Sequence, residues 1–281
     1  MANPIATNGT HYRQERYADK IVKLYRKLLV VRTEFMRDYE GDPVSGSIQV
    51  PVRGTDVAVS TYDVLNGNTL TQSATTYLPI LLTKNKIINE LIDKYEAASV
   101  PDNLIAQRLE SGSYSMGLTL ELNAIAELED NGTVESSTSA LTNTDAYTSI
   151  KNSVRDIKKL GVDVTDMVTI VDPDTEALLL EDVKFSNSAG ALGAELLREG
   201  VIGKINGVRV KMSANLSATT EYIVFARPWA QSVDEWIAEP FIEDIKDGKH
   251  VKASALQGRA IYEDKLTSAT ACRVKTVAAS I

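Results

Sequence analysis

The chain contains one cysteine, Cys272, and two histidines, His11 and His250. A single cysteine excludes an internal disulfide and is typical of chains that work in a reducing cytoplasm. Neither histidine has neighbours that resemble a catalytic triad or a set of metal ligands, so both are expected at the surface. Cys272 lies in an alternating stretch and is expected to be a small core residue. The sequence therefore predicts no catalytic residue, no cofactor-binding residue, no metal site and no enzyme activity.

Long apolar runs are also missing. No stretch reaches the roughly 18 apolar residues of a membrane span, and the N-terminus lacks the apolar core of a signal peptide. With 43% hydrophobic and 24% charged residues, the chain is predicted to be globular and soluble, without a membrane partner. Its 281 residues allow one large domain or two modest ones.

Motifs that bind phosphate or calcium are absent. The glycine-rich stretches 190–193 and 200–207 lack the spacing of a phosphate-binding loop and predict turns instead. Asp172-Pro173-Asp174 lacks the spacing of a calcium loop. It is typical of a helix start, with Asp172 as the N-cap and Pro173 in the first helical position.

Positive charge is scarce but unevenly placed. The net charge of −8 argues against a general nucleic-acid binder. The first 40 residues nevertheless hold eight Lys and Arg against five Asp and Glu, so they carry +3 and the remainder carries −11. This basic arm is a weak indication of an anionic partner, and a solvated helical face is the alternative interpretation.

The longest periodic feature predicts a helix from Pro101 to Glu129. Apolar or small residues recur on one face at spacings of three and four: Ile105, Leu109, Gly112, Met116, Leu120, Ala124 and Leu128. Such a helix is roughly 43 Å long at about 1.5 Å per residue. A compact core cannot cover all of it, so we expect other elements along its length. The alternative is a long amphipathic helix in an ordinary helical protein.

Two segments precede this helix. Tyr17–Phe35 predicts an amphipathic helix, whose basic face consists of Arg16, Lys20, Lys23, Arg26 and Lys27. Residues 43–83 predict a long thin hairpin with strand patterns at Ile48–Val52, Val57–Thr61 and Thr76–Thr83. Prolines confine two of these strands to edges or bulges. Because such a hairpin cannot build its own core, we expect it to lie on the body or on another subunit.

The remaining elements are predicted from shorter patterns. A short helix at Ile87–Ala98 leads into the long helix, and a Ser/Thr-rich loop at Thr133–Thr144 follows it. The other expected elements are a helix at Asp145–Leu160, a buried strand at Met167–Val171, a helix from Pro173 to Leu180, an irregular stretch at Phe185–Gly200, a glycine-punctuated turn and strand at Val201–Val210, a strand at Tyr222–Ala226, and two strands within Gly258–Val277.

The C-terminal half carries a recognisable succession of motifs. It contains Val168-Thr169-Ile170-Val171-Asp172-Pro173, Ile205-Asn206-Gly207-Val208-Arg209-Val210, Ser213-Ala214-Asn215-Leu216, Tyr222-Ile223-Val224-Phe225-Ala226-Arg227 and Gly258-Arg259-Ala260-Ile261-Tyr262. In this order, and preceded by an arm, a hairpin and a long helix, the sequence resembles the major capsid proteins of tailed bacteriophages, which have the Hong Kong-type shell fold. The resemblance covers nearly the whole chain from about residue 17.

The resemblance implies an α+β capsid fold with a spine helix, a peripheral domain and an axial domain. The expected boundaries are 1–42 for the N-terminal arm, 43–85 for the extended hairpin loop, 86–140 for the peripheral domain with the spine helix, 141–235 for the axial domain and 236–281 for the return to the peripheral domain. It further implies a subunit that is assembled in the host cytoplasm into pentamers and hexamers of the virion shell. The expected partners are other copies of the chain, a scaffold, a portal, decoration proteins and, without sequence specificity, packaged DNA. Neutralising the five basic residues of the arm is expected to impair assembly or packaging.

Two departures from the family refine these expectations. Residues 41–83 contain no lysine, whereas some members cross-link their subunits through a lysine of the extended loop, so we expect a non-covalent shell. Only some 40 residues precede the hairpin, which favours a separate scaffold protein over a built-in scaffolding segment. The alternatives are an encapsulin-type compartment that encloses cargo, and a soluble α/β enzyme with an unrecognised site.

Overall fold

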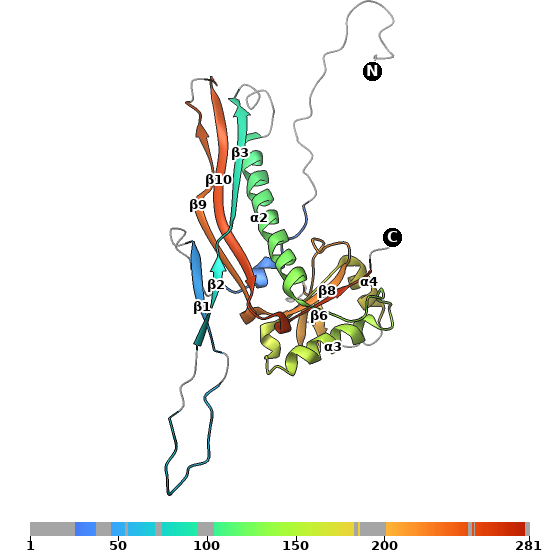
Figure 1. The fold of residues 1–281 in the computed structure, drawn as a ribbon. Coiled ribbons are helices and arrows are strands. Elements are labelled where there is room, and N and C mark those ends of the chain that lie inside the picture. The colour runs from blue at the N-terminus through green and yellow to red at the C-terminus, as the bar shows by residue number, and fades with distance from the viewer. Residues whose placement is uncertain are drawn as a thin grey trace, which may run out of the picture.

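The computed structural model of the chain describes residues 26–37, 46–53, 56–70, 75–94, 104–182, 185, 201–246, 249 and 251–278. A long helix lies beside a tall three-stranded sheet, and its C-terminal end reaches a second, six-stranded sheet (Figure 1). A hairpin extends from the base of the tall sheet away from both (Figure 1). None of the described helices combines the length and apolar character that a membrane crossing requires.

The long helix α2 spans Leu104–Asn131, which confirms the predicted spine helix. It packs on an antiparallel sheet of β3 (Lys84–Asp93), β10 (Ala253–Leu266) and β9 (Ala230–Asp244), in the order β3-β10-β9. Met116 and Leu120 of the helix form a core cluster with Tyr262 of β10. A Cβ at Gly112 would lie 2.9 Å from Leu256 Cδ2, so glycine allows the helix to approach the sheet closely.

The predicted short helix at Ile87–Ala98 is wrong over residues 87–93, because strand β3 occupies residues 84–93. The apolar residues Ile87, Ile88, Leu91 and Ile92 fit a helical face as well as two faces of a strand. Ten residues of β3 pair with β10, from Tyr262↔Lys84 to Ala253↔Asp93. This tertiary pairing, which the local pattern does not contain, decides the conformation.

Strand β9 has no counterpart among the predicted elements, although its 15 residues make it the longest strand described. It contains Pro240 and five acidic residues, which are unusual in a strand interior. The pairing of β9 with β10 shifts register around Arg259, where Gly258 faces Pro240. A Cβ at Gly258 would lie 3.2 Å from Pro240 Cα, so the bulge and the glycine together accommodate the proline.

The six-stranded sheet has the order β4-β11-β8-β5-β7-β6. Its strands are β4 (Thr133–Val134), β5 (Met167–Val171), β6 (Val201–Ile205), β7 (Val208–Met212), β8 (Thr220–Ala226) and β11 (Cys272–Thr276). Helices α3 (Ala146–Lys158) and α4 (Pro173–Glu181) lie on either side of β5 in the sequence. These elements confirm the predicted strands at Met167–Val171 and Tyr222–Ala226 and the helix at Asp145–Leu160.

Both faces of this sheet are covered. Tyr222 and Val224 belong to one core cluster with residues of α3 and α4, whereas Ile223 and Phe225 belong to another with residues of α2. Alternate residues of β8 thus point to opposite layers, as strand geometry requires. Because helices cover both faces, every residue of β5 is buried.

Local turn and cap chemistry behaves as the sequence predicts. Asp172 caps α4, with its Oδ2 accepting a hydrogen bond from Asp174 N at 3.3 Å, and Pro173 is the first helical residue. Asn206 and Gly207 have φ of 53° and 90° and connect β6 to β7 in a two-residue turn. Of the stretch predicted to be irregular, only Phe185 lies within the described residues, and its ring closes over Gly203.

The predicted loop at Thr133–Thr144 begins with β4, and two side chains from neighbouring strands hold it in place. Lys275 is buried, and its Nζ donates to Ser137 O at 2.5 Å and Ser139 O at 2.7 Å. Glu221 Oε1 accepts from Leu141 N at 2.7 Å. Burial raises the pKa of Glu221 above its usual value, and the nearby acidic residues Asp145 and Asp172 add to this shift.

This shift predicts a pH-dependent effect of Glu221→Gln. A carboxyl group whose pKa rises on folding contributes stability below its unfolded pKa, and this contribution is lost as pH rises through the folded pKa. Glutamine keeps an oxygen for Leu141 N but cannot ionise. Relative to wild type, the variant should gain stability between about pH 4 and about pH 7, by less than about 1 kcal/mol because solvent screens the half-buried group. Urea unfolding of both proteins at both pH values measures this difference. A variant whose advantage over wild type is larger at about pH 4 than at about pH 7 would contradict the prediction.

Cys272 is buried in the core, which confirms the sequence prediction. Its Sγ lies 3.9 Å from Leu128 O, and burial raises the pKa of the thiol far above its usual value. Because the thiolate is the reactive form, we expect a thiol reagent to modify Cys272 only after unfolding. The rate of colour release from a disulfide reagent, with and without denaturant, measures this. Fast release from the folded chain would contradict the prediction.

Candidate assembly interface

The described residues contain no group of three or more His, Cys, Asp or Glu side chains that could hold a metal ion. His11 and His250 both lie outside the described residues. Segments that extend from the body, and the contacts that hold them, are therefore the candidates for a functional surface. Two such segments stand out, the hairpin around β1 and β2 and the N-terminal stretch 26–37.

The base of the hairpin is firmly attached to the tall sheet. Strands β1 (Ser47–Arg53) and β2 (Thr75–Leu81) pair antiparallel, from Ser47↔Leu81 to Arg53↔Thr75. Val50 and Ile80 are buried in a small cluster with Val233 of β9. These strands confirm the predictions at Ile48–Val52 and Thr76–Thr83, although β2 ends at Leu81.

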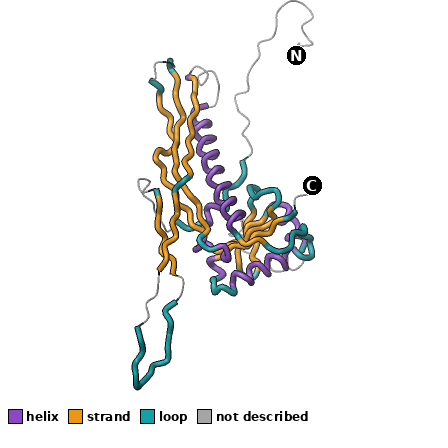
Figure 2. Tube along the Cα trace, in the orientation of Figure 1, coloured by secondary structure: helices purple, strands orange, loops and turns teal. Residues whose placement is uncertain are grey.

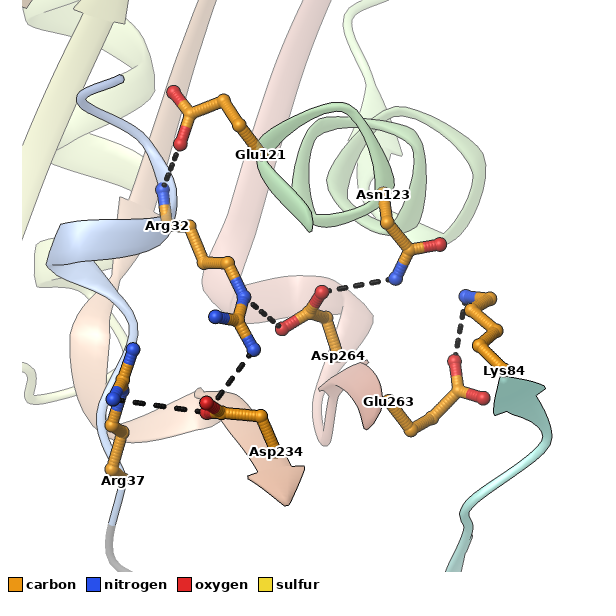
Figure 3. A network of polar contacts seen from close by, with 8 residues as sticks. All are labelled: Arg32, Arg37, Lys84, Glu121, Asn123, Asp234, Glu263 and Asp264. Atoms are coloured by element: carbon orange, nitrogen blue, oxygen red, sulfur yellow. Dashed lines mark hydrogen bonds and ion pairs between the residues drawn. The ribbon is translucent and has the colours of Figure 1, made fainter. Parts of the chain in front are cut away.

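A polar clamp holds the end of β2. Glu263 of β10 accepts from Thr83 Oγ1 at 2.6 Å. It also accepts from Lys84 Nζ at 2.7 Å (Figure 3). Lys84 is already the first residue of β3, so the clamp fixes the point where the hairpin meets the tall sheet. The direction of the hairpin is therefore set by the body of the subunit.

Beyond the strands, residues 56–70 form an extended loop that we call the hairpin loop (Figure 2). The strand predicted at Val57–Thr61 is wrong in the single chain, because these residues are not in a strand. Six large apolar side chains of the loop are more than 70% exposed: Val57, Val59, Tyr62, Val64, Leu65 and Leu70. Such a concentration of exposed apolar area marks a surface that binds another protein.

The turn of the hairpin loop is organised around Asp63. Its carboxylate accepts from Leu65 N at 2.9 Å and from Asn66 Nδ2 at 3.0 Å. Asn68 Oδ1 in turn accepts from Asp63 N at 2.8 Å. The bonds to the carboxylate, that from the Asn66 side chain first, lower the pKa of Asp63. The turn is thus preorganised, which reduces the entropy lost when the loop binds a partner.

The N-terminal stretch 26–37, which we call the strap, lies along α2. The predicted helix at Tyr17–Phe35 is wrong over its described part, where a 3-10 turn, η1 (Arg32–Glu34), is the sole helical segment. Arg16, Lys20 and Lys23 lie outside the described residues. Arg26 and Lys27 are described, but they contact the body instead of forming one free basic face.

Both residues hold the start of the strap. Arg26 NH1 lies 2.6 Å from Glu110 Oε1, and its guanidinium carbon lies 5.1 Å from the centre of the Tyr114 ring. Lys27 Nζ donates to Ala214 O at 2.5 Å. The amide N of Lys27 donates to Tyr114 Oη at 2.8 Å. These contacts involve solvent-exposed groups, so each contributes modestly to stability.

Glu121 of α2 is the main anchor of the strap. Glu121 is only 1% exposed, and its Oε1 accepts hydrogen bonds from Val30 N at 2.8 Å and Val31 N at 2.7 Å. Its Oε2 accepts from Arg32 N at 2.9 Å (Figure 3). One buried carboxylate thus receives three backbone N–H groups that lack helical partners. This explains why the strap does not continue as a helix despite its apolar periodicity.

The Arg32 side chain continues this network into the tall sheet. Its Nε lies 3.1 Å from Asp264 Oδ1 and its NH2 lies 3.2 Å from Asp234 Oδ1 (Figure 3). Asn123 Nδ2 donates to Asp264 Oδ2 at 2.9 Å. Asp264 is fully buried, so these bonds supply the partners that a buried charge requires. Glu121, Arg32 and Asp264 form what we call the strap anchor.

The other end of the strap reaches the six-stranded sheet. Glu34 lies 2.7 Å from Lys211 Nζ of β7, measured from Oε1, and 3.3 Å from Arg227 Nε, measured from Oε2. Met36 forms a parallel bridge with Gln231 at the start of β9. The strap therefore connects α2 and both sheets, so it holds the two halves of the subunit together.

Sequence reasoning missed the strap anchor because it followed apolar periodicity. The signal was a set of polar residues in the long helix, such as Glu121, Asn123 and Glu127, beside the apolar face. Glu127 behaves like Glu121, since its Oε1 accepts from Leu266 N at 3.0 Å and lies 3.1 Å from Lys265 Nζ. Acidic side chains on a helix that is packed on several sides indicate bonds to neighbouring segments.

Comparison with known proteins shows which family and which solved structures this chain is similar to. A family model described as phage capsid protein matches residues 90–267, more than half of the chain. A chain of Mycobacterium phage Che8 is similar with 20% identity and a TM-score of 0.75, covering 94% of this chain and 97% of that chain. A chain in the capsid structure of the cyanophage P-SCSP1u has 14% identity and a TM-score of 0.74, covering 95% of this chain and 93% of that chain.

A third solved structure agrees with these two. A chain of the mature capsid of bacteriophage PhiM1 has 13% identity and a TM-score of 0.74, covering 100% of this chain and 98% of that chain. No curated protein matches the chain by sequence. The α+β fold predicted from the resemblance is confirmed by these similarities over nearly the full length.

Proposed function

Because the chain belongs to the phage capsid protein family, we propose that it is the major capsid protein of a tailed bacteriophage. In this role it assembles as pentamers and hexamers into the icosahedral shell that encloses the phage DNA. Its place is then the capsid of the virion, and its role is structural rather than enzymatic.

The hairpin loop is the observation that supports this proposal most directly. Its large apolar side chains are exposed in the single chain, while its base is clamped to the body. A segment of this kind gains its burial from a neighbouring subunit. A contact between a protruding arm and a different surface of the next copy is heterologous, and such contacts form rings where the rotation between subunits closes.

The division into regions stays part of the proposal. The arm (1–42), the extended hairpin loop (43–85), the peripheral domain (86–140 and 236–281) and the axial domain (141–235) are assigned by analogy with the family. The tall sheet with α2 suits the peripheral domain. The six-stranded sheet with α3 and α4 suits the axial domain, whose loops would surround the five-fold and six-fold axes.

Partners other than the chain itself also belong to the proposal. We expect a separate scaffold protein during assembly in the host cytoplasm, then a portal, decoration proteins and packaged DNA. The basic residues Arg16, Lys20 and Lys23 are the part of the arm that we assign to an inner contact with scaffold or DNA. Arg26 and Lys27 instead hold the strap on the body.

Electron microscopy of purified particles tests the proposal. Recombinant chain, alone and with its neighbouring gene products, is expected to form shells, tubes, or rings of five and six subunits. Particles filled with a protein cargo would favour the encapsulin-type alternative. A monomer under all conditions would contradict the proposal and favour the α/β enzyme, for which the described residues offer no metal-binding cluster.

A non-covalent shell is a further prediction. No lysine lies in residues 41–83, and Lys84 at the base of the hairpin is engaged with Glu263 at 2.7 Å. The protruding loop therefore offers no lysine amine that could form an isopeptide bond. Mature particles boiled in detergent should give a single band at 30.6 kDa in gel electrophoresis. A ladder of oligomers would show the prediction to be wrong.

A further inference from the structure

The six-stranded layer separates its charges toward the two ends of its strands. Strands β5 and β7 are parallel, and β8 runs antiparallel to β5. The β6–β7 turn therefore lies at the end where β5 begins, whereas α4 and the start of β8 lie at the end where β5 stops. Helix α3 connects these ends over roughly 20 Å at about 1.5 Å per residue.

Five cationic residues lie at the first of these ends, which we call the basic end, together with three acidic residues, Asp156, Asp163 and Asp166. The cations are Arg155, Lys158, Lys159, Lys204 and Arg209. Lys158 Nζ at the end of α3 donates to Asn206 O in the β6–β7 turn at 2.7 Å, which brings the helix and the turn together. Lys204 and Arg209 are exposed and directly opposite each other across the β6–β7 pair.

The three carboxylates at the basic end compensate its charge only in part, which leaves five cations against three anions. Asp156 accepts from Arg155 Nε at 3.1 Å and from Lys159 Nζ at 3.0 Å, and these bonds, that from Lys159 first, lower its pKa. Within the described part of the chain, Lys204 and Arg209 form no ion pair. Like charges directly opposite each other on a strand pair are destabilising. An anionic partner at this end would relieve that repulsion.

The opposite end of the layer carries acidic residues, and we call it the acidic end. It consists of Asp145, Asp172, Asp174, Glu176 and Glu221. Asp172 N donates to Glu221 O at 3.0 Å, so the end of β5 and the start of β8 lie side by side. Burial raises the pKa of Asp172, and the neighbouring charge of Asp174 raises it further. Lys27 and Lys275 are the cations that offset this repulsion.

We propose that the basic end of this layer docks against the acidic end of a second copy of the chain. The inference rests on the proposed function, since it names the contact through which axial domains would follow one another in a ring. The two ends are different surfaces of one subunit, so the contact is heterologous and repeats in the same direction around the ring. Charge complementarity sets the register of such a contact and speeds its formation. A second copy is a better partner for the basic end than nucleic acid is. Docking between copies pairs the basic end with the acidic end, whereas nucleic acid would leave the acidic end without a partner.

Charge reversal at each end, separately and together, tests the contact. The variants are Lys204→Glu/Arg209→Glu, Asp174→Lys/Glu176→Lys and the combination of all four substitutions. Assembled and unassembled fractions are measured by sedimentation at low and high salt. Each double variant should reduce the assembled fraction by about tenfold at low salt, and the combined variant should recover most of the loss because the charges are again complementary. Circular dichroism checks that each subunit is folded.

A control matched to the basic-end variant makes the same change of charge elsewhere. Lys86→Glu/Lys246→Glu reverses two exposed lysines, one in β3 and one two residues after the end of β9, and should assemble like wild type. A combined variant no better than the weaker double variant would overturn the inference. So would basic-end variants that assemble normally but lose packaged DNA, since the partner would then be nucleic acid. If the wild-type chain forms no rings or shells, the proposed function itself fails.

Discussion

Replacing Glu121 with alanine is expected to lower the free energy of unfolding by about 3 to 5 kcal/mol. The substitution removes the acceptor of three N–H groups, from Val30, Val31 and Arg32, at 2.7 to 2.9 Å. All three belong to buried residues, so each donor loses its bond without free access to water. Denaturant unfolding measures the loss. Hydrogen exchange at the three amides should accelerate more than exchange in the centre of β5.

Two matched variants separate this cause from a general effect on the helix. Glu121→Gln keeps one oxygen but turns an N–H donor toward Arg32 N, so a loss of about 1 to 3 kcal/mol is expected. Asp130→Ala removes an exposed carboxylate from the last turn of the same helix and should stay within about 0.5 kcal/mol of wild type. Equal effects of Glu121→Ala and Asp130→Ala would show that the Glu121 carboxylate does not hold the strap.

The strap shows where local sequence patterns stop being informative. The spacing of Leu24, Leu28, Val31 and Phe35 predicts a helix that continues into the strap, and Val31 and Phe35 are indeed buried. Burial alone does not fix the backbone conformation. Glu121, which is some 90 positions away in the sequence, supplies acceptors that replace the helical hydrogen bonds. A bond of that sequence separation cannot be inferred from the strap itself.

Elements with strong local signals were predicted well. Helix α4 has its cap and proline, α3 has a clear apolar face, and β5 is an apolar run bounded by turn residues. Strands β3 and β9 have no such local signal. Their conformation is fixed by pairing with β10, which lies between them in the sheet. Of the arm residues predicted to act together, Arg26 and Lys27 are placed by contacts with Glu110, Tyr114 and Ala214. None of these contacts is visible in the local charge pattern.

The hairpin and the strap use polar and apolar contacts for different purposes, polar contacts within the subunit and apolar contacts with a neighbour. Buried polar bonds hold the strap and the hairpin base inside one chain, where Glu121 and Glu263 accept from several donors each. The hairpin loop alone carries six large apolar side chains that are more than 70% exposed. A subunit built in this way can fold before it assembles, and it keeps its main apolar contact for a neighbour.

Substituting two apolar residues of the hairpin loop should then abolish assembly without unfolding the subunit. Val59 and Leu65 are 98% and 92% exposed, so Val59→Asp/Leu65→Asp removes no buried contact within the single chain. If both side chains become buried against a neighbour, their loss costs about 4 kcal/mol per contact, which is roughly a thousandfold in its association constant. Sedimentation should show free subunits, and denaturant unfolding should match wild type within about 0.5 kcal/mol.

The neighbouring residue Ala58 offers a control for the added charge. Ala58→Asp introduces one carboxylate into the same exposed loop but removes only a methyl group, and successive residues of an extended chain point in opposite directions. Val59→Asp alone should weaken assembly by about 2 kcal/mol, or roughly 30-fold, whereas Ala58→Asp should have a much smaller effect. Equal effects would mean that charge, not apolar burial, opposes assembly. Normal assembly of the double variant would show that the hairpin loop does not bind the neighbouring subunit through these side chains.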